Sequence, residues 1–273
     1  LAITFTNKAA GELRERLVNA IGDEANDIWA YTFHSCCSRI LRRFGEKIGY
    51  TNHFTIYDTD DSRRVMKQCQ KQLGIEDKLI NHKSILAEIS RAKDSLISPE
   101  EYKQTAQNDF RKSKIAECYE LYQAQLKKSD AMDFDDIIFN TVKLLEENED
   151  VRNLYQTQFK YVMVDEYQDT NHAQYVLTSL LADKYKNICV VGDDDQSIYR
   201  FRGATIENIL SFENHYKGAK VIRLEENYRS TQNILDGANA VISHNKNRKG
   251  KTLFTRSGSG DKIVYKTVMS ESE

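Results

Sequence analysis

The segment Tyr161-Val-Met-Val-Asp165-Glu166-Tyr-Gln-Asp169 is a short apolar run that ends in acidic and amide residues. Apolar runs of this kind recur at residues 2–5, 28–33 and 188–191, with a weaker one at 220–224. Short runs rich in β-branched and aromatic side chains fit buried parallel strands. Helical patterns, as at residues 9–18 and 173–181, separate the runs. This alternation predicts an α/β domain with a parallel sheet and flanking helices.

Residues 56–130 lack the strand pattern and carry apolar residues at helical spacing instead. Val65, Cys69 and Leu73 form one such stripe. Further stripes are Ile85, Ile89 and Ala92, and then Ile115, Tyr119, Tyr122 and Leu126. The single proline, Pro99, stands between Ser98 and Glu101, where it fits the first position of a helix with a capping box. We therefore expect an all-helical subdomain inserted into the α/β domain.

Composition limits the class of protein. The 273 residues include 39 basic and 41 acidic side chains, so the net charge of −2 indicates neither a basic nor an acidic tail. Five cysteines without a C-x-x-C pattern favour reduced thiols in a cytoplasmic protein over a zinc site or a disulfide scaffold. No run approaches the roughly 18 apolar residues of a membrane helix, so no membrane contact is expected.

Asp165 and Glu166 follow a predicted buried strand, where ligands bind in open α/β sheets. An Asp at this place can hold Mg²⁺, and the next Glu can orient or deprotonate a water that attacks a phosphate. The acids could also be ordinary loop residues. Because Gln168 and Asp169 crowd the same turn of a strongly acidic stretch, residues 133–170, mutual repulsion favours a bound cation.

The run at 188–191 also leads into acids, in Gly192-Asp-Asp-Asp195-Gln196-Ser-Ile-Tyr199-Arg-Phe201-Arg202-Gly203-Ala204. Gln196 could sense a phosphate, and Tyr199 and Phe201 could stack on bases. Arg200 and Arg202 could meet nucleic-acid phosphates. The alternative is a loop whose aromatic residues belong to the core, but alternating aromatic and Arg residues beside three acids favour binding.

Gly250-Lys251-Thr252 matches only the end of a P-loop. The first glycine of that motif should fall at position 245, which is Asn245, and no apolar strand precedes it. No other Gly-Lys-Ser/Thr occurs in residues 1–273. The chain therefore has no P-loop of its own.

Six segments together resemble the UvrD/PcrA/Rep type of superfamily-one DNA helicase, in the order of that family. They are residues 4–10 (TFTNKAA), 32–35 (TFHS), 133–136 (DFDD), 164–170 (VDEYQDT), 192–204 (GDDDQSIYRFRGA) and 224–230 (LEENYRS). The resemblance implies an incomplete first RecA-like ATPase domain at 1–55 and 131–230. It also implies an inserted helical subdomain at 56–130 and the start of a second RecA-like domain at 231–273.

The resemblance also implies site residues. Asp165 would hold Mg²⁺, Glu166 would be the base for water, and Gln196 and Arg229 would sense the γ-phosphate of ATP. Tyr228 would stack on adenine. The predicted single-strand contacts are Phe5, Asn7, Thr32, His34, Tyr199, Phe201 and Arg202. Many family members have Trp where Phe201 stands, so we expect weaker base stacking there.

The implied activity is that of an ATP-dependent, 3′-to-5′ DNA helicase in repair or replication, acting on single strands and their junctions with duplex. The family's P-loop would precede Leu1 and its last two motifs would follow Glu273, so we expect residues 1–273 alone to be inactive as an ATPase. Two alternatives stay open at this stage. One is a nuclease whose two metals are held by Asp165, Glu166, Asp169 and the acids at 193–195. The other is a non-catalytic module that binds single strands.

Overall fold

The computed structural model describes residues 1–107, 109–246, 248–267 and 270, and it leaves out the side chain of Arg202. The chain divides into two compact units. The first unit comprises residues 1–193 and 197–208, and the second comprises 194–196 and 209–273. Within the described residues, no helix is long and apolar enough to cross a membrane.

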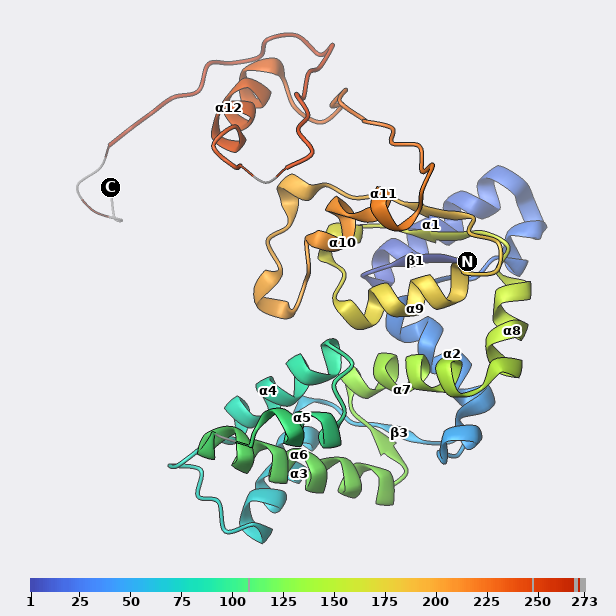
Figure 1. The fold of residues 1–273 in the computed structure, drawn as a ribbon. Coiled ribbons are helices and arrows are strands. Elements are labelled where there is room, and N and C mark those ends of the chain that lie inside the picture. The colour runs from blue at the N-terminus through green and yellow to red at the C-terminus, as the bar shows by residue number, and fades with distance from the viewer. Residues whose placement is uncertain (108, 247, 268–269, 271–273) are drawn as a thin grey trace. The chain divides into compact units, whose positions relative to one another are not determined.

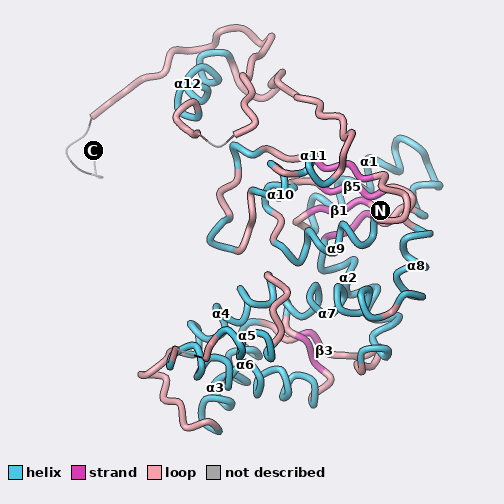
Figure 2. Tube along the Cα trace, in the orientation of Figure 1, coloured by secondary structure: helices cyan, strands magenta, loops and turns pink. Residues whose placement is uncertain are grey.

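The first unit is built on a parallel sheet whose strands stand in the order β2-β1-β5-β6. Figure 2 draws the strands in magenta and labels β1 and β5. The strands are β1 (Ala2–Thr4), β2 (Ala30–Thr32), β5 (Val162–Val164) and β6 (Ile188–Val190). Ile3 pairs with Tyr31 on one side and with Val164 on the other. Each strand falls inside an apolar run, so the predicted α/β fold with a parallel sheet is confirmed, and it is that of a RecA-like domain.

Helices flank the sheet or pack on the helices beside it, because their apolar faces need burial. They are α1 (Asn7–Ile21), α2 (Phe33–Phe44), α7 (Phe134–Glu147), α8 (Glu149–Gln158) and α9 (His172–Ala182). Helix α7 packs against α2 and α9. Side chains cap four of the five N-termini, as Thr32 does by accepting from the Ser35 N–H. Short 3-10 helices follow α1 (η1, Gly22–Asp27) and α2 (η2, Gly45–Ile48).

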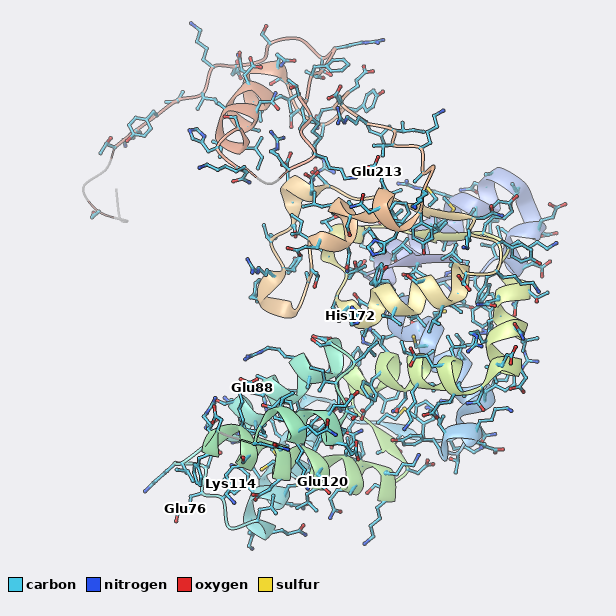
Figure 3. All side chains as sticks on the ribbon, viewed as in Figure 1. Glu76, Glu88, Lys114, Glu120, His172 and Glu213 are labelled. Carbon is cyan, nitrogen blue, oxygen red and sulfur yellow. The ribbon has the colours of Figure 1, made fainter. Side chains whose placement is uncertain are left out.

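The predicted helical insertion consists of four helices that gather at one end of the first unit (Figure 1). They are α3 (Thr59–Gln72), α4 (His82–Asp94), α5 (Pro99–Thr105) and α6 (Phe110–Lys128). Their core includes Ile85, Ile89, Ile115, Tyr119 and Leu126. Charged residues such as Glu76 and Glu120 lie on the outside (Figure 3). Pro99 begins α5 behind the Ser98–Glu101 capping box, as predicted.

A parallel pair of two-residue strands closes the insertion at its base. Strand β3 (Thr55–Ile56) pairs with β4 (Ala131–Met132), with Thr55 opposite Ala131. This pair was not predicted, because two residues are too few to show a strand period. The pair joins the two ends of the insertion.

A buried ion cluster lies where the insertion meets α7. The ammonium of Lys93 in α4 lies 2.7 Å from Asp133 Oδ2 and 2.8 Å from Asp136 Oδ1. Burial tends to lower the pKa of Lys93, but the charges of Asp133 and Asp136 outweigh it and the pKa lies well above its usual value. These acids of the 133–170 stretch, where a cation site was expected, are therefore paired with a side chain of the protein.

The second unit contains α12 (Gln232–Ile242) and a four-residue helix, α11 (Phe212–His215). Another four-residue helix, α10 (Glu207–Leu210), spans the division between the units. The weak strand expected at 220–224 is wrong. Val221, Ile222 and Leu224 are 47%, 69% and 78% exposed, and a single bridge joins Glu226 to Phe254 instead. An apolar run forms a strand only where a neighbour pairs with it, and within the described residues this run has none.

Candidate functional site

The turn after β5 presents Asp165 and Glu166 to solvent. Both residues are exposed, although Val164 just before them is buried. Glu166 adopts a left-handed backbone with φ of 50°, which is uncommon for a residue other than glycine and is frequent at functional sites. The Glu166 N–H donates to Asp165 Oδ1 at 3.0 Å. A 3-10 helix, η3 (Tyr167–Asp169), follows and buries Tyr167 and Gln168.

Gln168 connects this turn to the end of β6. Its Nε2 donates to Glu166 Oε2 at 2.7 Å, and its Oε1 accepts from the Asp193 N–H at 2.9 Å. The Gln168 side chain is buried, with the residue 1% exposed. The two acid-tipped strands are therefore linked through one amide.

The acids of the turn do not converge on a common point. Across the part of the chain that the structure describes, no group of three or more His, Cys, Asp or Glu side chains could hold a metal ion. The structure therefore does not bring Asp165, Glu166 and Asp169 together as one three-carboxylate group, and a cation at this turn stays a prediction. Partial burial and the charge of Glu166 raise the pKa of Asp169. Asp165 alone still fits Mg²⁺, because this ion keeps several waters and binds one or two carboxylates together with substrate phosphates.

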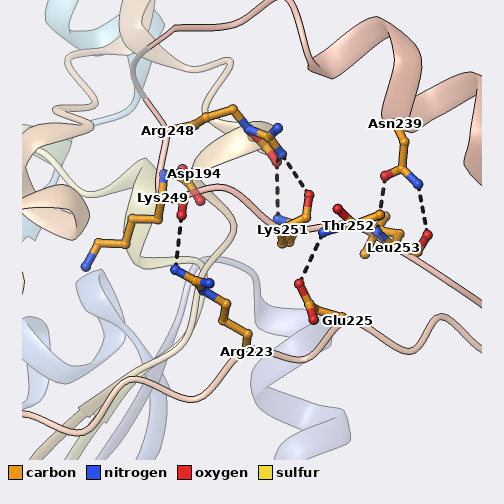
Figure 4. Close-up of polar contacts among 10 residues, drawn as sticks. Asp194, Arg223, Glu225, Asn239, Arg248, Lys249, Lys251, Thr252 and Leu253 are labelled. Atoms are coloured by element: carbon orange, nitrogen blue, oxygen red, sulfur yellow. Dashed lines mark hydrogen bonds and ion pairs between the residues drawn. The ribbon is translucent and has the colours of Figure 1, made fainter.

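Two of the three acids after β6 are held by basic residues within the second unit (Figure 4). Arg248 donates to Asp195 from Nε to Oδ1 at 2.7 Å and from Nη2 to Oδ2 at 2.5 Å. The Lys251 Nζ lies 3.6 Å from Asp195 Oδ2. Asp194 Oδ2 accepts from the Lys249 N–H at 2.7 Å. Lys251, from the incomplete P-loop match, thus pairs with a carboxylate. These pairings do not favour the nuclease hypothesis, which needed the same acids as metal ligands.

The predicted nucleotide residues Gln196, Tyr228 and Arg229 also belong to the second unit. Gln196 ends a 3-10 helix, η4 (Asp194–Gln196). Asn227 Oδ1 accepts from the N–H groups of Arg229 and Ser230 at 3.0 and 2.8 Å, which fixes the turn that carries Tyr228. Tyr228 is 83% exposed, as a ring that stacks on a base must be before binding. The charge of Glu226 raises the pKa of Tyr228.

Predicted single-strand contacts follow the carboxyl ends of β1 and β2. Phe5 follows β1 and meets the Phe33 ring edge-on at 5.4 Å, and Asn7 begins α1. Thr32 ends β2 and caps α2. Since β1, β2 and β5 are parallel, these residues lie on the same edge of the sheet as Asp165 and Glu166.

His34 on α2 packs against Phe134, with ring centroids 4.5 Å apart. Burial lowers the pKa of His34 to about 4, so the imidazole is neutral near pH 7. Phe134 is 58% exposed at the start of α7. Phe134 was not among the predicted single-strand contacts, although it lies in the segment 133–136. The available signal was an aromatic residue at the first position of a capped helix.

Tyr199 and Phe201 lie side by side, with ring centroids 6.0 Å apart. Phe201 is 78% exposed and is the middle residue of the 3-10 turn η5 (Arg200–Arg202). The side chain of Arg202 lies outside the described residues. Phe201 therefore presents an accessible ring, while its predicted base contact stays a prediction.

Asp94 of the insertion contacts two segments of the candidate site, the turn after β5 and the segment 192–204. Asp94 Oδ1 accepts from Asn171 Nδ2 at 2.5 Å, directly after the acid turn. On the other side, a Cβ added to Gly203 would lie 2.7 Å from Asp94 Oδ2, and Gly203 has a φ of 84°. Position 203 therefore needs glycine for both space and backbone conformation. Sequence reasoning missed this contact because Asp94 is distant in the chain from both partners.

The fold agrees with comparisons to known proteins. The model of the UvrD/REP helicase N-terminal domain matches residues 1–217, and that of the UvrD-like helicase C-terminal domain matches residues 222–273. The chain belongs to the UvrD/REP helicase family. The resemblance inferred from the six segments is thus confirmed.

Its relatives in this helicase family include three proteins named ATP-dependent DNA helicase PcrA. Those from Staphylococcus epidermidis and Leuconostoc citreum are each 50% identical to the chain, and that from Staphylococcus aureus is 49% identical. The matches cover 100% of this chain but only 36% to 37% of those relatives. The chain thus spans a little over a third of the length of the relatives it matches.

Proposed function

We propose that residues 1–273 serve as part of an ATP-dependent DNA helicase that moves 3′ to 5′ along a single strand and separates duplex DNA. The observation that carries the proposal is the shared sheet edge. The exposed pair Asp165 and Glu166 follows β5, and the aromatic positions Phe5 and His34 follow β1 and β2. One edge therefore offers groups for phosphate chemistry and groups for base contact.

The roles of the acidic residues follow from their chemistry. Glu166 would orient and deprotonate the attacking water, and Asp165 would hold Mg²⁺. Bound Mg²⁺ would neutralise charge on the phosphates of ATP. These are the roles of a phosphoryl-transfer site in which positioning and electrostatics supply the rate.

The family resemblance assigns further nucleotide roles to residues of the second unit. Gln196 and Arg229 would sense the γ-phosphate, and Tyr228 would stack on adenine. A fixed Arg at the γ-phosphate stabilises the charge that develops during transfer. Tyr199, Phe201 and Arg202, three to six residues after Gln196, would pass that signal to a bound strand.

The proposed division of the chain follows the family. Residues 1–55 and 131–230 would form the first RecA-like domain, 56–130 the inserted subdomain, and 231–273 the start of the second RecA-like domain. Because residues 1–273 contain no P-loop, ATP hydrolysis would require a P-loop from outside them. The partners would be single-stranded DNA and its junctions with duplex, in a cytoplasmic protein of DNA repair or replication.

DNA-dependent ATP turnover in the longer protein that contains this chain tests the proposal. We expect hydrolysis that requires Mg²⁺ and rises when single-stranded DNA is added. A protein that nicks DNA with Mg²⁺ but without ATP would favour the nuclease alternative. A protein that binds single strands without any ATP turnover would favour the non-catalytic module.

A further inference from the structure

We propose that Gln168 is a positioning residue, which fixes the carboxylate of Glu166 by anchoring it to the backbone after β6. This inference rests on the proposed function, in which Glu166 is the base for water. It adds a role for a residue that the sequence analysis noted only as part of a crowded turn.

The backbone of the turn leaves the Glu166 carboxylate to be placed by a partner. Asp165 Oδ1 and the left-handed φ of 50° fix the main chain of Glu166. The side chain is exposed and rotates about three bonds, so its carboxylate would sample several positions. The hydrogen bond of 2.7 Å from Gln168 Nε2 selects one of them.

The orientation of the Gln168 amide is determined from both sides. The Asp193 N–H can only donate, so it requires the amide oxygen, which lies 2.9 Å away. The carboxylate of Glu166 can only accept, so it requires the amide NH₂. Both partners thus specify the same orientation. Because Gln168 is buried, no bulk water replaces either partner.

The same turn is tied to β6 by its main chain. The Tyr167 N–H donates to the Val191 carbonyl at 2.9 Å. Ser197 Oγ donates to the Gln168 carbonyl at 3.4 Å. These hydrogen bonds fix the turn that carries Glu166 relative to residues 191–193 and Ser197. Gln168 is the side chain that joins Glu166 to Asp193.

Two variants in the longer protein test this role. Gln168→Glu keeps the size and an oxygen for the Asp193 N–H, but it has no N–H for Glu166. Gln168→Met keeps the length without either hydrogen bond and adds no charge. We expect both to lower kcat for ATP by about tenfold to 100-fold, a part of the roughly 10²–10⁴ that a positioned base contributes. The Kd for ATP should change less than about twofold, because Gln168 touches the base and not the predicted nucleotide contacts.

Gln156→Glu is the matched control. Gln156 is another buried glutamine, 6% exposed, and its Nε2 donates to the Leu180 carbonyl at 2.7 Å away from the turn. It should lower thermal stability and leave kcat unchanged. Gln168→Met keeps the test decisive if Gln168→Glu prevents folding.

The outcomes separate this inference from the proposed function. If the wild type turns over ATP and Glu166→Gln does not, but the Gln168 variants match the wild type, only the positioning role is overturned. If the Gln168 variants lose ATP affinity and kcat together, or if Gln156→Glu lowers kcat equally, the role is structural and the inference is again overturned. A wild type without ATP turnover overturns the proposed function and the inference together.

Discussion

Lys93 in α4 lies 2.7 Å from Asp133, the residue that caps α7, and the pair is almost fully buried. Side-chain exposures are 1% for Lys93 and 10% for Asp133. The Tyr122 hydroxyl donates to the same carboxylate at 3.0 Å. The ammonium of Lys93, in the insertion, therefore neutralises the carboxylate of Asp133, which caps the helix that begins at Phe134.

Replacing Lys93 by Met should destabilise the chain by about 3–5 kcal/mol, because two acids would be left buried without their cation. Denaturant unfolding of residues 1–273 measures this. The control is Lys103→Met, which removes an exposed pair with Glu120 and should cost far less stability than Lys93→Met. Equal costs for the two variants would contradict a special role for the buried cluster.

Asp94 should make stability depend on pH. Burial, and secondarily the charge of Asp135, raise the pKa of Asp94 to about 7. The folded protein holds this proton more tightly than the unfolded chain does. The contribution of protonated Asp94 to the free energy of unfolding is therefore complete below about pH 4 and is lost as the pH rises through 7. Asp94→Asn should therefore gain stability relative to the wild type between pH 5 and 8, by a few kcal/mol at most.

The measurement is the free energy of unfolding of the wild type and of Asp94→Asn across this pH range. Asn can still accept a hydrogen bond from Asn171, so the contact itself is kept. Asp23→Asn, at an exposed position, serves as the control and should leave the pH profile unchanged. A constant difference between Asp94→Asn and the wild type from pH 4 to 8 would refute the predicted titration.

Phe201 should contribute base stacking to single-strand binding. Its ring is 78% exposed, so Phe201→Ala should barely change stability while weakening oligonucleotide binding by about 1–3 kcal/mol. Fluorescence anisotropy with a labelled single strand measures the Kd. Binding should also weaken as salt rises, because phosphate contacts release counterions.

The control for Phe201 is Phe110→Ala, a substitution of another exposed phenylalanine at the start of α6. It should leave the Kd unchanged. Equal effects of the two variants would mean that stacking is not specific to the segment after Gln196.

Residues 1–273 should not bind ATP with micromolar affinity, since they contain no P-loop to cradle its phosphates. Isothermal calorimetry with Mg²⁺ and ATP tests this, and the longer protein provides the positive control. Micromolar binding by residues 1–273 would show that Gln196, Tyr228 and Arg229 suffice for the nucleotide, and the requirement for a P-loop would be withdrawn.

The four strands of the parallel sheet could be predicted because such strands are continuous apolar runs, as at 161–164 and 188–191. The expected burial holds for Val162 and Val164, whereas β6 at the sheet edge is only partly buried. The stripe of Ile115, Tyr119, Tyr122 and Leu126 likewise predicted α6 and its buried face. The apolar run at 220–224 gave the same signal and failed, because a strand also needs a partner.

Tertiary contacts were beyond sequence reasoning. Lys93 and Asp133 are 40 positions apart, and nothing local marks either as half of a buried pair. Gln168 looked like any polar residue of a turn, because its partner is the backbone N–H of Asp193, which follows β6 and is 25 positions away. The chemistry of each side chain could be read from the sequence, whereas the residues that it contacts depend on the fold.

The central claim is that Glu166 is the base in an ATP-driven helicase, and single-turnover ATP hydrolysis by Glu166→Gln tests it most directly. The measurement uses the longer protein with single-stranded DNA, and exposed Glu147→Gln on α7 is the control. We predict that Glu166→Gln binds ATP like the wild type but loses hydrolysis by at least about 100-fold, while Glu147→Gln is unaffected. Hydrolysis by Glu166→Gln within a few-fold of the wild type would contradict the account.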